Sequence, residues 1–311
     1  MVLKNSGPKG YPGMALIGVD WGTSSLRVAR IDERGEAIEE RSSARGILTV
    51  KPGEFPAVLN EACGDWMAQD RSLVLVSGMA GSRQGWVEAP YIPCPAGFGD
   101  IASQLAWVEP GRAGIVPGLS SHHDGVPDVL RGEETQVFGA LALLQLGDAT
   151  AVLPGTHSKW VRVEAGRIDS FVTFMTGEVY ALLRHHSILG RTMEAPGSEV
   201  LDEEAFCAGI TQAMKAGSLL KAAFSARTLS LFDLLPARSG ASYLSGLVIG
   251  EELRSQQFAL PSAEVVVIAG PELARRYELA LRFAGMQPRC VGSQATWRGL
   301  SAIAQQLRDT A

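Results

Sequence analysis

Apolar residues along the chain fall into short runs that end at a small or charged residue, a pattern typical of buried strands that open into turns. Residues 15–19 form one such run before Asp20, and residues 26–31 then alternate apolar and charged positions. Further runs that predict buried strands lie at 73–76, 149–153 and 265–269. Apolar positions at helical spacing predict helices over 134–146, most of 202–258, 273–283 and 296–307. We therefore expect an α/β fold.

The first strand, turn and hairpin recur half a chain later. With an offset of 133 residues, small and hydroxyl-bearing residues of the two turns coincide: Gly22 with Gly155, Thr23 with Thr156, and Ser25 with Ser158. A repeat at this spacing predicts two domains of one design that face each other across a cleft. Coincidence is the alternative, since Gly-Thr-x-Ser is short, but a hairpin follows both turns.

Length and composition agree with two domains. The chain has 311 residues, of which 46% are hydrophobic, enough for two cores of roughly 150 residues each. The first residues are rich in glycine and proline and lack the apolar core of a signal peptide, so we expect a disordered tail over 1–14. We expect an N-terminal domain at 15–145 and a C-terminal domain at 146–311. A helical insertion is expected at about 195–262, and the last helix is expected to return toward the N-terminal domain.

The two Gly-Thr turns predict a site for a polyphosphate. Small residues let backbone N–H groups approach a phosphate, hydroxyl groups add donors, and Asp20 could hold hydrated Mg²⁺. One grip would comprise Asp20, Gly22, Thr23, Ser24 and Ser25, and the other Gly155, Thr156, His157 and Ser158, with Lys159 as a point charge. Each turn alone could be an ordinary glycine turn. A third turn at Gly270-Pro271 favours the phosphate interpretation.

The segment 131–136, Arg-Gly-Glu-Glu-Thr-Gln, is the best candidate for a general base that accepts the proton of an acceptor hydroxyl. Glu133 and Glu134 could instead be acidic residues that stabilise a helix N-terminus, and Asp124 and Asp128 are weaker alternatives for the base. A carboxylate on the acceptor would be recognised by Arg83 or Arg131, with Ser82 and Gln84 beside the former. Either arginine could also be an exposed ion-pair partner.

Several classes of protein and site find no support. The net charge of −5 and the scattered Lys and Arg residues argue against nucleic acid, and no apolar run reaches the 18 or so residues of a membrane span. Four widely spaced cysteines indicate reduced thiols in a cytoplasmic protein. The pairs His122-His123 and His185-His186 lack metal-ligand spacing. The P-loop, the dinucleotide-binding and the hydrolase-elbow motifs are absent.

Three segments resemble the phosphate-1, phosphate-2 and adenosine motifs of the actin, hexokinase and sugar-kinase superfamily: 20–24, 153–160 and 268–271. More narrowly, the sequence resembles the 2-dehydro-3-deoxygalactonokinase family through the segments 78–86, 131–136, 174–178 and 242–247. Together these segments span most of residues 15–308.

The resemblance implies two ribonuclease-H-like, or actin-like ATPase, domains flanking a cleft, and transfer of phosphate from Mg·ATP to the 6-hydroxyl of 2-dehydro-3-deoxy-D-galactonate. In related glycerol-type kinases a Gly-Asp-Gln segment supplies the base where this chain has Gly132-Glu133-Glu134, so which glutamate acts stays open. Gly270-Pro271 replaces the usual paired glycines of the adenosine motif. A filament-forming or chaperone-like ATPase and an exopolyphosphatase-like hydrolase are the rival functions. The epimer of the sugar acid and homo-oligomer formation also stay open.

Overall fold

The computed structural model describes residues 15–69, 72–195, 197, 200–256 and 264–309. The predicted tail 1–14 and a small part of the expected insertion lie outside these residues. Contacts divide the described chain into two compact units. Unit 1 comprises the described residues within 1–149, 161–172 and 291–311, and unit 2 those within 150–160 and 173–290.

Unit 1 is built around a six-stranded sheet of order β3-β2-β1-β4-β7-β6. Its strands are β1 (Ala15–Trp21), β2 (Leu26–Ile31), β3 (Ala37–Ser43), β4 (Ser72–Gly78), β6 (Ala106–Glu109) and β7 (Ala113–Ile115). β1 is antiparallel to β2 but parallel to β4, and β4 is parallel to β7. Every residue of β4 is buried, as expected of a strand covered on both faces. A second sheet of order β5-β8-β9 contains β5 (Tyr91–Pro93), β8 (Gly118–His123) and β9 (Val126–Leu130).

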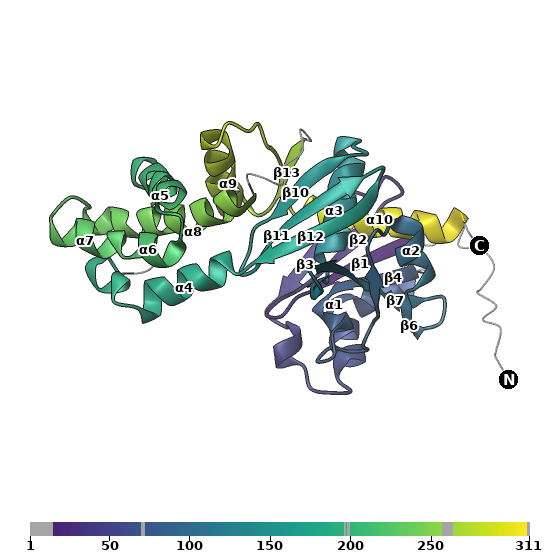
Figure 1. Cartoon of the computed structure of the whole chain (residues 1–311). Helices are drawn as coiled ribbons and strands as arrows, with labels where there is room; N and C mark the ends of the chain where they lie inside the picture. The colour runs from purple at the N-terminus through teal and green to yellow at the C-terminus, as the bar shows by residue number, and fades with distance from the viewer. Residues whose placement is uncertain (1–14, 70–71, 196, 198–199, 257–263, 310–311) are drawn as a thin grey trace. The chain divides into compact units, whose positions relative to one another are not determined.

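The helices of unit 1 are α1 (Phe55–Gln69), α2 (Phe98–Ser103), α3 (Glu133–Leu144) and α10 (Gln294–Asp309). α10 and α3 pack against each other at two glycines: a Cβ added to Gly139 would lie 1.7 Å from the Ala295 carbonyl oxygen, and one added to Gly299 would lie 1.9 Å from the Thr135 carbonyl oxygen. Figure 1 shows the two helices side by side. This close approach at Gly299 fixes the first turn of α3.

The other large sheet has the order β12-β11-β10-β13-β14. Its strands are β10 (Ala149–Leu153), β11 (Ser158–Glu164), β12 (Arg167–Phe174), β13 (Val265–Ile268) and β14 (Arg289–Val291). In both large sheets the first strand lies between its own hairpin and the fourth strand, to which it is parallel. This shared order is that of ribonuclease-H-like domains. It confirms the α/β fold class and the duplication inferred from the two Gly-Thr turns.

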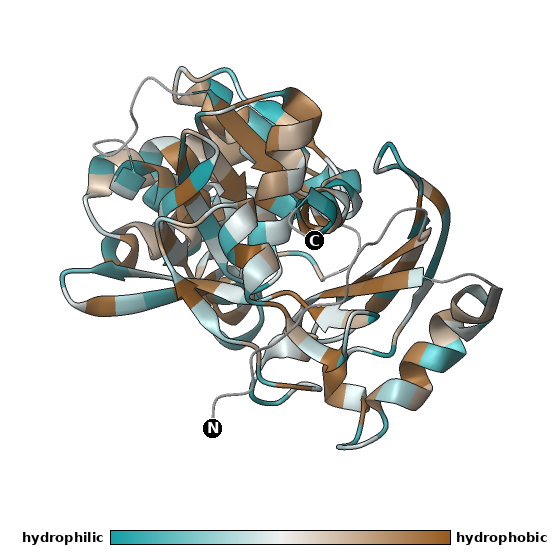
Figure 2. Ribbon diagram, turned by 90° about the vertical axis from the view of Figure 1, so that its right-hand side faces the viewer, coloured by the Kyte–Doolittle hydropathy of each residue, from teal (hydrophilic) through white to brown (hydrophobic). Residues whose placement is uncertain are grey.

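The helices of unit 2 are α4 (Thr176–His186), α5 (Glu203–Ala216), α6 (Leu219–Ala223), α7 (Ser225–Leu231), α8 (Gly240–Gln256) and α9 (Pro271–Phe283). α5 and α8 approach closely, because a Cβ at Gly209 would lie 2.2 Å from the Tyr243 carbonyl oxygen. Short 3-10 helices occupy Ile47–Thr49, Met79–Gly81, Leu189–Thr192 and Ala237–Ser239. In Figure 2 hydrophobic residues colour much of the strands, whereas the helices show both hydrophobic and polar residues.

Two segments from the second half of the chain belong to unit 1. Residues 161–172, from β11 and β12, and the described part of 291–311 make most of their contacts with unit 1. The physical reason for the second of these is the packing of α10 on α3. No helix among the described residues has both the length and the hydrophobicity needed to cross a membrane.

Candidate functional site

The first predicted phosphate turn joins β1 to β2 in unit 1. The Gly22 N–H donates to the Ser25 carbonyl oxygen at 2.9 Å, and the Ile47 N–H donates to the Gly22 carbonyl oxygen at 3.0 Å. Trp21 is fully buried, and its indole N–H donates to the Arg45 carbonyl oxygen at 2.8 Å. Backbone groups of the segment after β3 therefore hold the turn and the end of β1 in place. The turn leaves three hydroxyl-bearing side chains exposed: Thr23, Ser24 and Ser25.

Asp20 lies at the end of β1 and is paired with Arg27, which the sequence analysis did not anticipate. Arg27 Nη2 is 2.7 Å and Nε 3.2 Å from Asp20 Oδ2. The Arg27 guanidinium also lies over the Trp297 ring of α10, 5.2 Å from its centroid. The Asp20 side chain is 23% exposed, and its Oδ1 has no hydrogen-bond partner among the described residues. One carboxylate oxygen of Asp20 thus forms an ion pair with Arg27, while the other is available to a cation or to water.

Two glycines with positive φ bring the 78–86 and 131–136 segments close to Asp20. Gly78 has φ of 95°, and a Cβ there would lie 2.8 Å from the Trp21 carbonyl oxygen and 3.5 Å from Asp20 Oδ1. Gly132 has φ of 106°, and a Cβ there would lie 3.1 Å from Gly78 Cα. Unit 1 therefore gathers Asp20 and the start of α3 at one edge of its sheet.

Glu134 is the fully buried glutamate of this edge. Its Oε2 accepts the Gly132 N–H at 2.7 Å, and its Oε1 accepts the Thr135 hydroxyl at 3.1 Å. Thr135 Oγ1 in turn accepts the Ser77 hydroxyl of β4 at 3.0 Å. Burial raises the pKa of Glu134 to about 7, the charge of Glu133 adds to the rise, and the hydrogen bonds oppose it. Glu134 therefore ties the glycine turn, α3 and β4 together.

Glu133 is only partly buried and lies in the first turn of α3. Its Oε2 accepts the Arg131 N–H at 2.9 Å, and no partner of Oε1 is found among the described residues. A carboxylate held through one oxygen, with the second one open, is suited to accept a proton from a bound hydroxyl. The two glutamates therefore have different surroundings, which sequence reasoning had left unresolved.

Arg131 is 8% exposed and directed into the protein. Its Nη2 donates to the Ala89 carbonyl oxygen at 2.9 Å, its Nε donates to the Tyr91 hydroxyl at 3.2 Å, and the guanidinium stacks 4.1 Å from the Tyr91 ring centroid. Its Nη1 is buried and has no hydrogen-bond partner among the described residues, and a Cβ at Gly81 would lie 2.8 Å from it. Much of the Arg131 side chain is thus occupied by structural contacts, but the N–H groups of one guanidinium nitrogen, Nη1, have no partner among the described residues.

The other predicted acceptor residues lie on the loop after the 3-10 helix Met79–Gly81. Ser82 Oγ is buried without a partner among the described residues. Arg83 is 87% exposed and reaches Glu88 at 3.4 Å, and Gln84 is exposed. The loop therefore presents one buried hydroxyl and two exposed polar side chains.

The second predicted phosphate turn, in unit 2, rests on the start of α4. The Glu178 N–H donates to the Thr156 carbonyl oxygen at 2.9 Å, and Glu178 Oε2 lies 2.7 Å from His157 Nε2. A Cβ at Gly177 would lie 2.3 Å from the Gly155 carbonyl oxygen, so only glycine fits there without displacing the turn. The 174–178 segment thus supports the turn. Thr156 and His157 are exposed and available to a ligand.

Ser158 and Lys159 are buried, unlike the rest of this turn. Lys159 Nζ donates to Thr173 Oγ1 at 2.8 Å. The Ser158 hydroxyl donates to Glu252 Oε1 at 2.8 Å. The Ser158 side chain is therefore directed toward a buried carboxylate, and any contact of this residue with a phosphate would have to use its backbone N–H.

A pocket of about 180 Å³ adjoins this turn within unit 2. Its walls come from α4, α8 and the first turns of α9, and the lining residues include Gly155, Gly177, Tyr180, Val248, Ile249 and Leu273. Arg276, also in the lining, donates to Ser245 Oγ at 3.3 Å. Gly270 caps α9, Pro271 is its first residue, and both are exposed. The predicted adenosine turn thus leads directly into the helix that lines this pocket.

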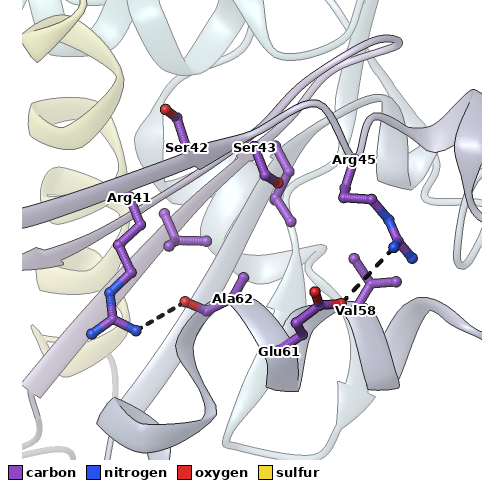
Figure 3. Close-up of a pocket in the computed structure, with 9 residues that line it drawn as sticks. Arg41, Ser42, Ser43, Arg45, Val58, Glu61 and Ala62 are labelled. Carbon is purple, nitrogen blue, oxygen red and sulfur yellow. Dashed lines mark hydrogen bonds and ion pairs between the residues drawn. The ribbon is translucent and has the colours of Figure 1, made fainter.

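A second cavity of about 180 Å³ lies in unit 1 between β3 and α1, and Figure 3 shows its lining. Arg41 donates to the Ala62 carbonyl oxygen at 3.2 Å, and Arg45 lies 3.9 Å from Glu61. None of the predicted site residues lines this cavity.

The two aspartates that were weaker alternatives for the base lie in or beside the β8–β9 turn. Asp124 has φ of 51° in the β8–β9 turn, and Asp128 Oδ1 accepts the Val129 N–H. Trp86, the last residue of the segment 78–86, packs on Phe55 and Trp21. Among the described residues there is no group of three or more His, Cys, Asp or Glu arranged to hold a metal ion, and all four cysteines are free.

Sequence reasoning found the turns and the glutamates but gave no role to the residues that hold them. Arg27, Thr135 and Tyr91 fix the unit 1 residues, and Glu252, Gly177 and Tyr277 fix those of unit 2. Thr135 and Gly177 lie in the segments 131–136 and 174–178 that carried the family resemblance. A further signal was Glu252, a carboxylate within the apolar helical segment 240–253.

Comparisons with known proteins find a matching family, related sequences and a related structure over most of this chain. A family model described as 2-keto-3-deoxy-galactonokinase matches residues 20–303. The 2-dehydro-3-deoxygalactonokinase of Escherichia coli (strain K12) is 35% identical over 290 residues, covering 93% of this chain and 97% of that protein. A crystal structure of a Sinorhizobium meliloti protein, provisionally assigned as a 2-dehydro-3-deoxygalactonokinase, has a TM-score of 0.85 and 36% identity, with 93% of this chain and 98% of that chain covered.

Proposed function

Because the chain belongs to the 2-keto-3-deoxy-galactonokinase family, whose members are sugar-acid kinases, we propose that it transfers the γ-phosphoryl group of ATP to the 6-hydroxyl of 2-dehydro-3-deoxy-D-galactonate. Beyond family membership, the proposal rests on the arrangement of acidic residues at one edge of the unit 1 sheet. There, Asp20 and the Glu133-Glu134 pair are brought together by the close approach of Gly78 and Gly132.

Glu133 is the proposed general base. Its partial exposure and its open Oε1 support this role. The resemblance of Gly132-Glu133-Glu134 to the Gly-Asp-Gln segment of glycerol-type kinases, in which the middle residue is the aspartate, also supports it. In the reaction the acceptor hydroxyl gives its proton to Glu133, its oxygen forms a bond to the γ-phosphorus, and the bond from that phosphorus to the bridging oxygen of ADP breaks. Most of the rate enhancement comes from positioning and charge neutralisation.

Glu134 is the proposed positioning residue for this base. Its side chain is fully buried and both oxygens accept hydrogen bonds, so it does not contact a substrate in this conformation. By holding the Gly132 N–H and Thr135 it fixes the backbone from which Glu133 projects.

The β1–β2 turn is the proposed first phosphate grip, with the backbone of Gly22 and the hydroxyls of Thr23, Ser24 and Ser25 as donors. Mg²⁺ prefers one or two carboxylates together with phosphate oxygens and water. The available Oδ1 of Asp20 fits this preference, and Asp20 would hold the ion through water. When bound, Mg²⁺ neutralises charge on the phosphates.

The unit 2 turn from Gly155 to His157 is the proposed second phosphate grip, and the adjoining pocket is the proposed site for adenine. Apolar walls from Val248, Ile249 and Leu273 suit a flat base. Gly270 and Pro271, at the start of α9, would border it. Lys159 is engaged by Thr173, so we assign it a supporting rather than a direct charge contact.

The acceptor carboxylate is the proposed partner of the unused donors near the 81–89 loop. Buried polar groups in proteins are almost always satisfied. Arg131 Nη1 and the Ser82 hydroxyl have no partner among the described residues, which supports a ligand there. Access to them requires movement of the loop that carries Arg83 and Gln84. We place the reaction in the cytoplasm, in keeping with four free cysteines.

The test is an ADP-release assay with purified protein, Mg·ATP and a panel of sugar acids. We expect ADP release that depends on 2-dehydro-3-deoxygalactonate, and less with its gluco epimer or with acids that lack the 2-keto group. ADP or phosphate release that is independent of any sugar acid would favour an ATPase instead, and release of phosphate from polyphosphate would favour an exopolyphosphatase.

A further inference from the structure

Glu252 is a buried carboxylate of α8 that lies behind the unit 2 pocket. It is 1% exposed. Its Oε1 accepts the Ser158 hydroxyl at 2.8 Å and the Trp160 indole N–H at 2.6 Å, and its Oε2 accepts the Tyr277 hydroxyl at 2.8 Å and the Thr176 hydroxyl. Among the described residues no lysine or arginine pairs with it. Four donors converge on one buried carboxylate without a counter-ion.

Such a group is costly to bury, so its hydrogen bonds must be well formed. Burial raises the pKa of Glu252, and the four donors oppose that rise. The Trp160 indole can only donate, and Ser158 and Tyr277 also contact each other at 3.3 Å between their hydroxyl oxygens. The Glu252 carboxylate therefore accepts hydrogen bonds through both of its oxygens, two on each.

The four donors come from three elements around the proposed nucleotide site. Ser158 and Trp160 are both in β11, with Ser158 directly after the Gly155 turn, Thr176 begins α4, and Tyr277 is in α9. Thr176 and Tyr277 line the pocket together with Gly155, whereas Glu252 itself does not. Glu252 thus touches the residues that form the site but would not touch the nucleotide.

Resting on the ATP site proposed above, we infer that Glu252 is a positioning residue for nucleotide binding: it fixes the Gly155 turn, the start of α4 and α9 in the arrangement that receives ATP. Because the Ser158 hydroxyl donates to Glu252, the phosphates are left to the backbone N–H groups of the turn and to Thr156. Loss of the carboxylate should weaken ATP binding without affecting the binding of the sugar acid, because the residues proposed to bind the sugar acid lie in unit 1.

Glu252→Gln is the decisive variant. The amide keeps the shape of the side chain, but only its oxygen can accept hydrogen bonds, whereas the carboxylate accepts them through both oxygens. We expect the Kd of Mg·ATP, measured by calorimetry without acceptor, to rise about tenfold or more, as expected when a hydrogen bond to a charged group is lost. The KM for ATP should rise in parallel, and the KM for the sugar acid should stay within twofold. Tyr277→Phe, which removes one donor, should raise the ATP Kd by a smaller factor of about three.

Glu251→Gln is the matched control. Glu251 is the neighbouring glutamate on α8, and it pairs with Arg254 away from the pocket lining. Its removal should leave the ATP Kd unchanged.

The inference is overturned if Glu252→Gln folds and binds ATP as the wild type does, even with a lower melting temperature, since that would leave only a structural role. If Glu252→Gln does not fold, Tyr277→Phe decides, and an unchanged ATP Kd overturns the inference. A wild type that binds ATP but phosphorylates no sugar acid would contradict the proposed function and leave this test intact, whereas a wild type that binds no ATP would overturn both.

Discussion

Arg27 Nη2 lies 2.7 Å from Asp20 Oδ2, and the two residues are directly opposite each other on β2 and β1. Arg27 is itself held by α10, through the Trp297 ring and a 3.4 Å contact with Thr296 Oγ1. The last helix of unit 1 therefore orients the carboxylate that the proposed mechanism needs beside the phosphates. An ion pair of two partly exposed groups contributes little to stability, so orientation is its more important effect.

Replacing Asp20 with Asn should lower kcat by about a hundredfold or more, because the amide can still accept from Arg27 but no longer carries the charge that holds hydrated Mg²⁺. The fold should be retained. Steady-state assays over a range of Mg²⁺ concentrations check this expectation, with Glu39→Gln, on the exposed edge strand β3, as the control. A kcat within threefold of the wild type for Asp20→Asn would remove this residue from the mechanism.

Substitution by Gln should reduce kcat to different extents at the two glutamates that begin α3. Glu133→Gln should reduce kcat on the order of a hundredfold or more, the usual effect of losing a general base, with a smaller change in the KM for ATP. Glu134→Gln should retain more of the kcat, because its hydrogen bonds to Gly132 and Thr135 can be partly replaced by an amide. The reverse order of effects would make Glu134 the base.

The stability of the protein should depend on pH through Glu134. Its pKa rises from 4.5 to about 7 on folding, so the folded state holds a proton that the unfolded state has released between these pH values. The stabilisation is fully present below the unfolded pKa and is lost as pH rises through the folded pKa, with a slope of roughly 1.4 kcal/mol per pH unit.

Urea unfolding between pH 4.5 and 8 checks this, with Glu134→Gln as the reference. As pH rises through this window, the unfolding free energy of the wild type should fall relative to that of the variant. A difference that is independent of pH would contradict the assignment of a raised pKa to Glu134.

Gly177→Ala should weaken ATP binding, because its Cβ would lie 2.3 Å from the Gly155 carbonyl oxygen and 2.9 Å from Thr156 Cα, displacing the second phosphate turn. We expect the KM for ATP to rise about tenfold, in keeping with overpacking against backbone, while the KM for the sugar acid changes little. Gly99→Ala is the control, since a Cβ at Gly99 meets no atom within 4 Å. Equal KM values for ATP in the two variants would show that the turn tolerates displacement.

Sequence alone predicted the parts of this molecule that depend on local pattern. The runs at 15–19, 73–76, 149–153 and 265–269 are strands, and the offset between Gly22 and Gly155 corresponds to two sheets of the same order. These features follow from hydrophobic periodicity and turn chemistry, which are properties of neighbouring residues.

The rest depends on partners that are distant in sequence. Nothing near Ser158 in the chain indicates that its hydroxyl donates to Glu252, and the Arg27 ion pair follows from the β1–β2 register rather than from composition. The different surroundings of Glu133 and Glu134 likewise arise from the packing of α3 on α10 and β4. The two adjacent glutamates were indistinguishable until this packing was known.

The position of the transferred phosphate tests the central claim most directly. Purified protein is incubated with Mg·ATP and 2-dehydro-3-deoxy-D-galactonate, and the product is examined by phosphorus NMR for coupling to the protons of carbon 6. We predict one phosphorylated product with the phosphorus on the 6-oxygen and an equal amount of ADP. Inorganic phosphate without a phosphorylated sugar acid, or phosphorylation at another hydroxyl, would contradict the account.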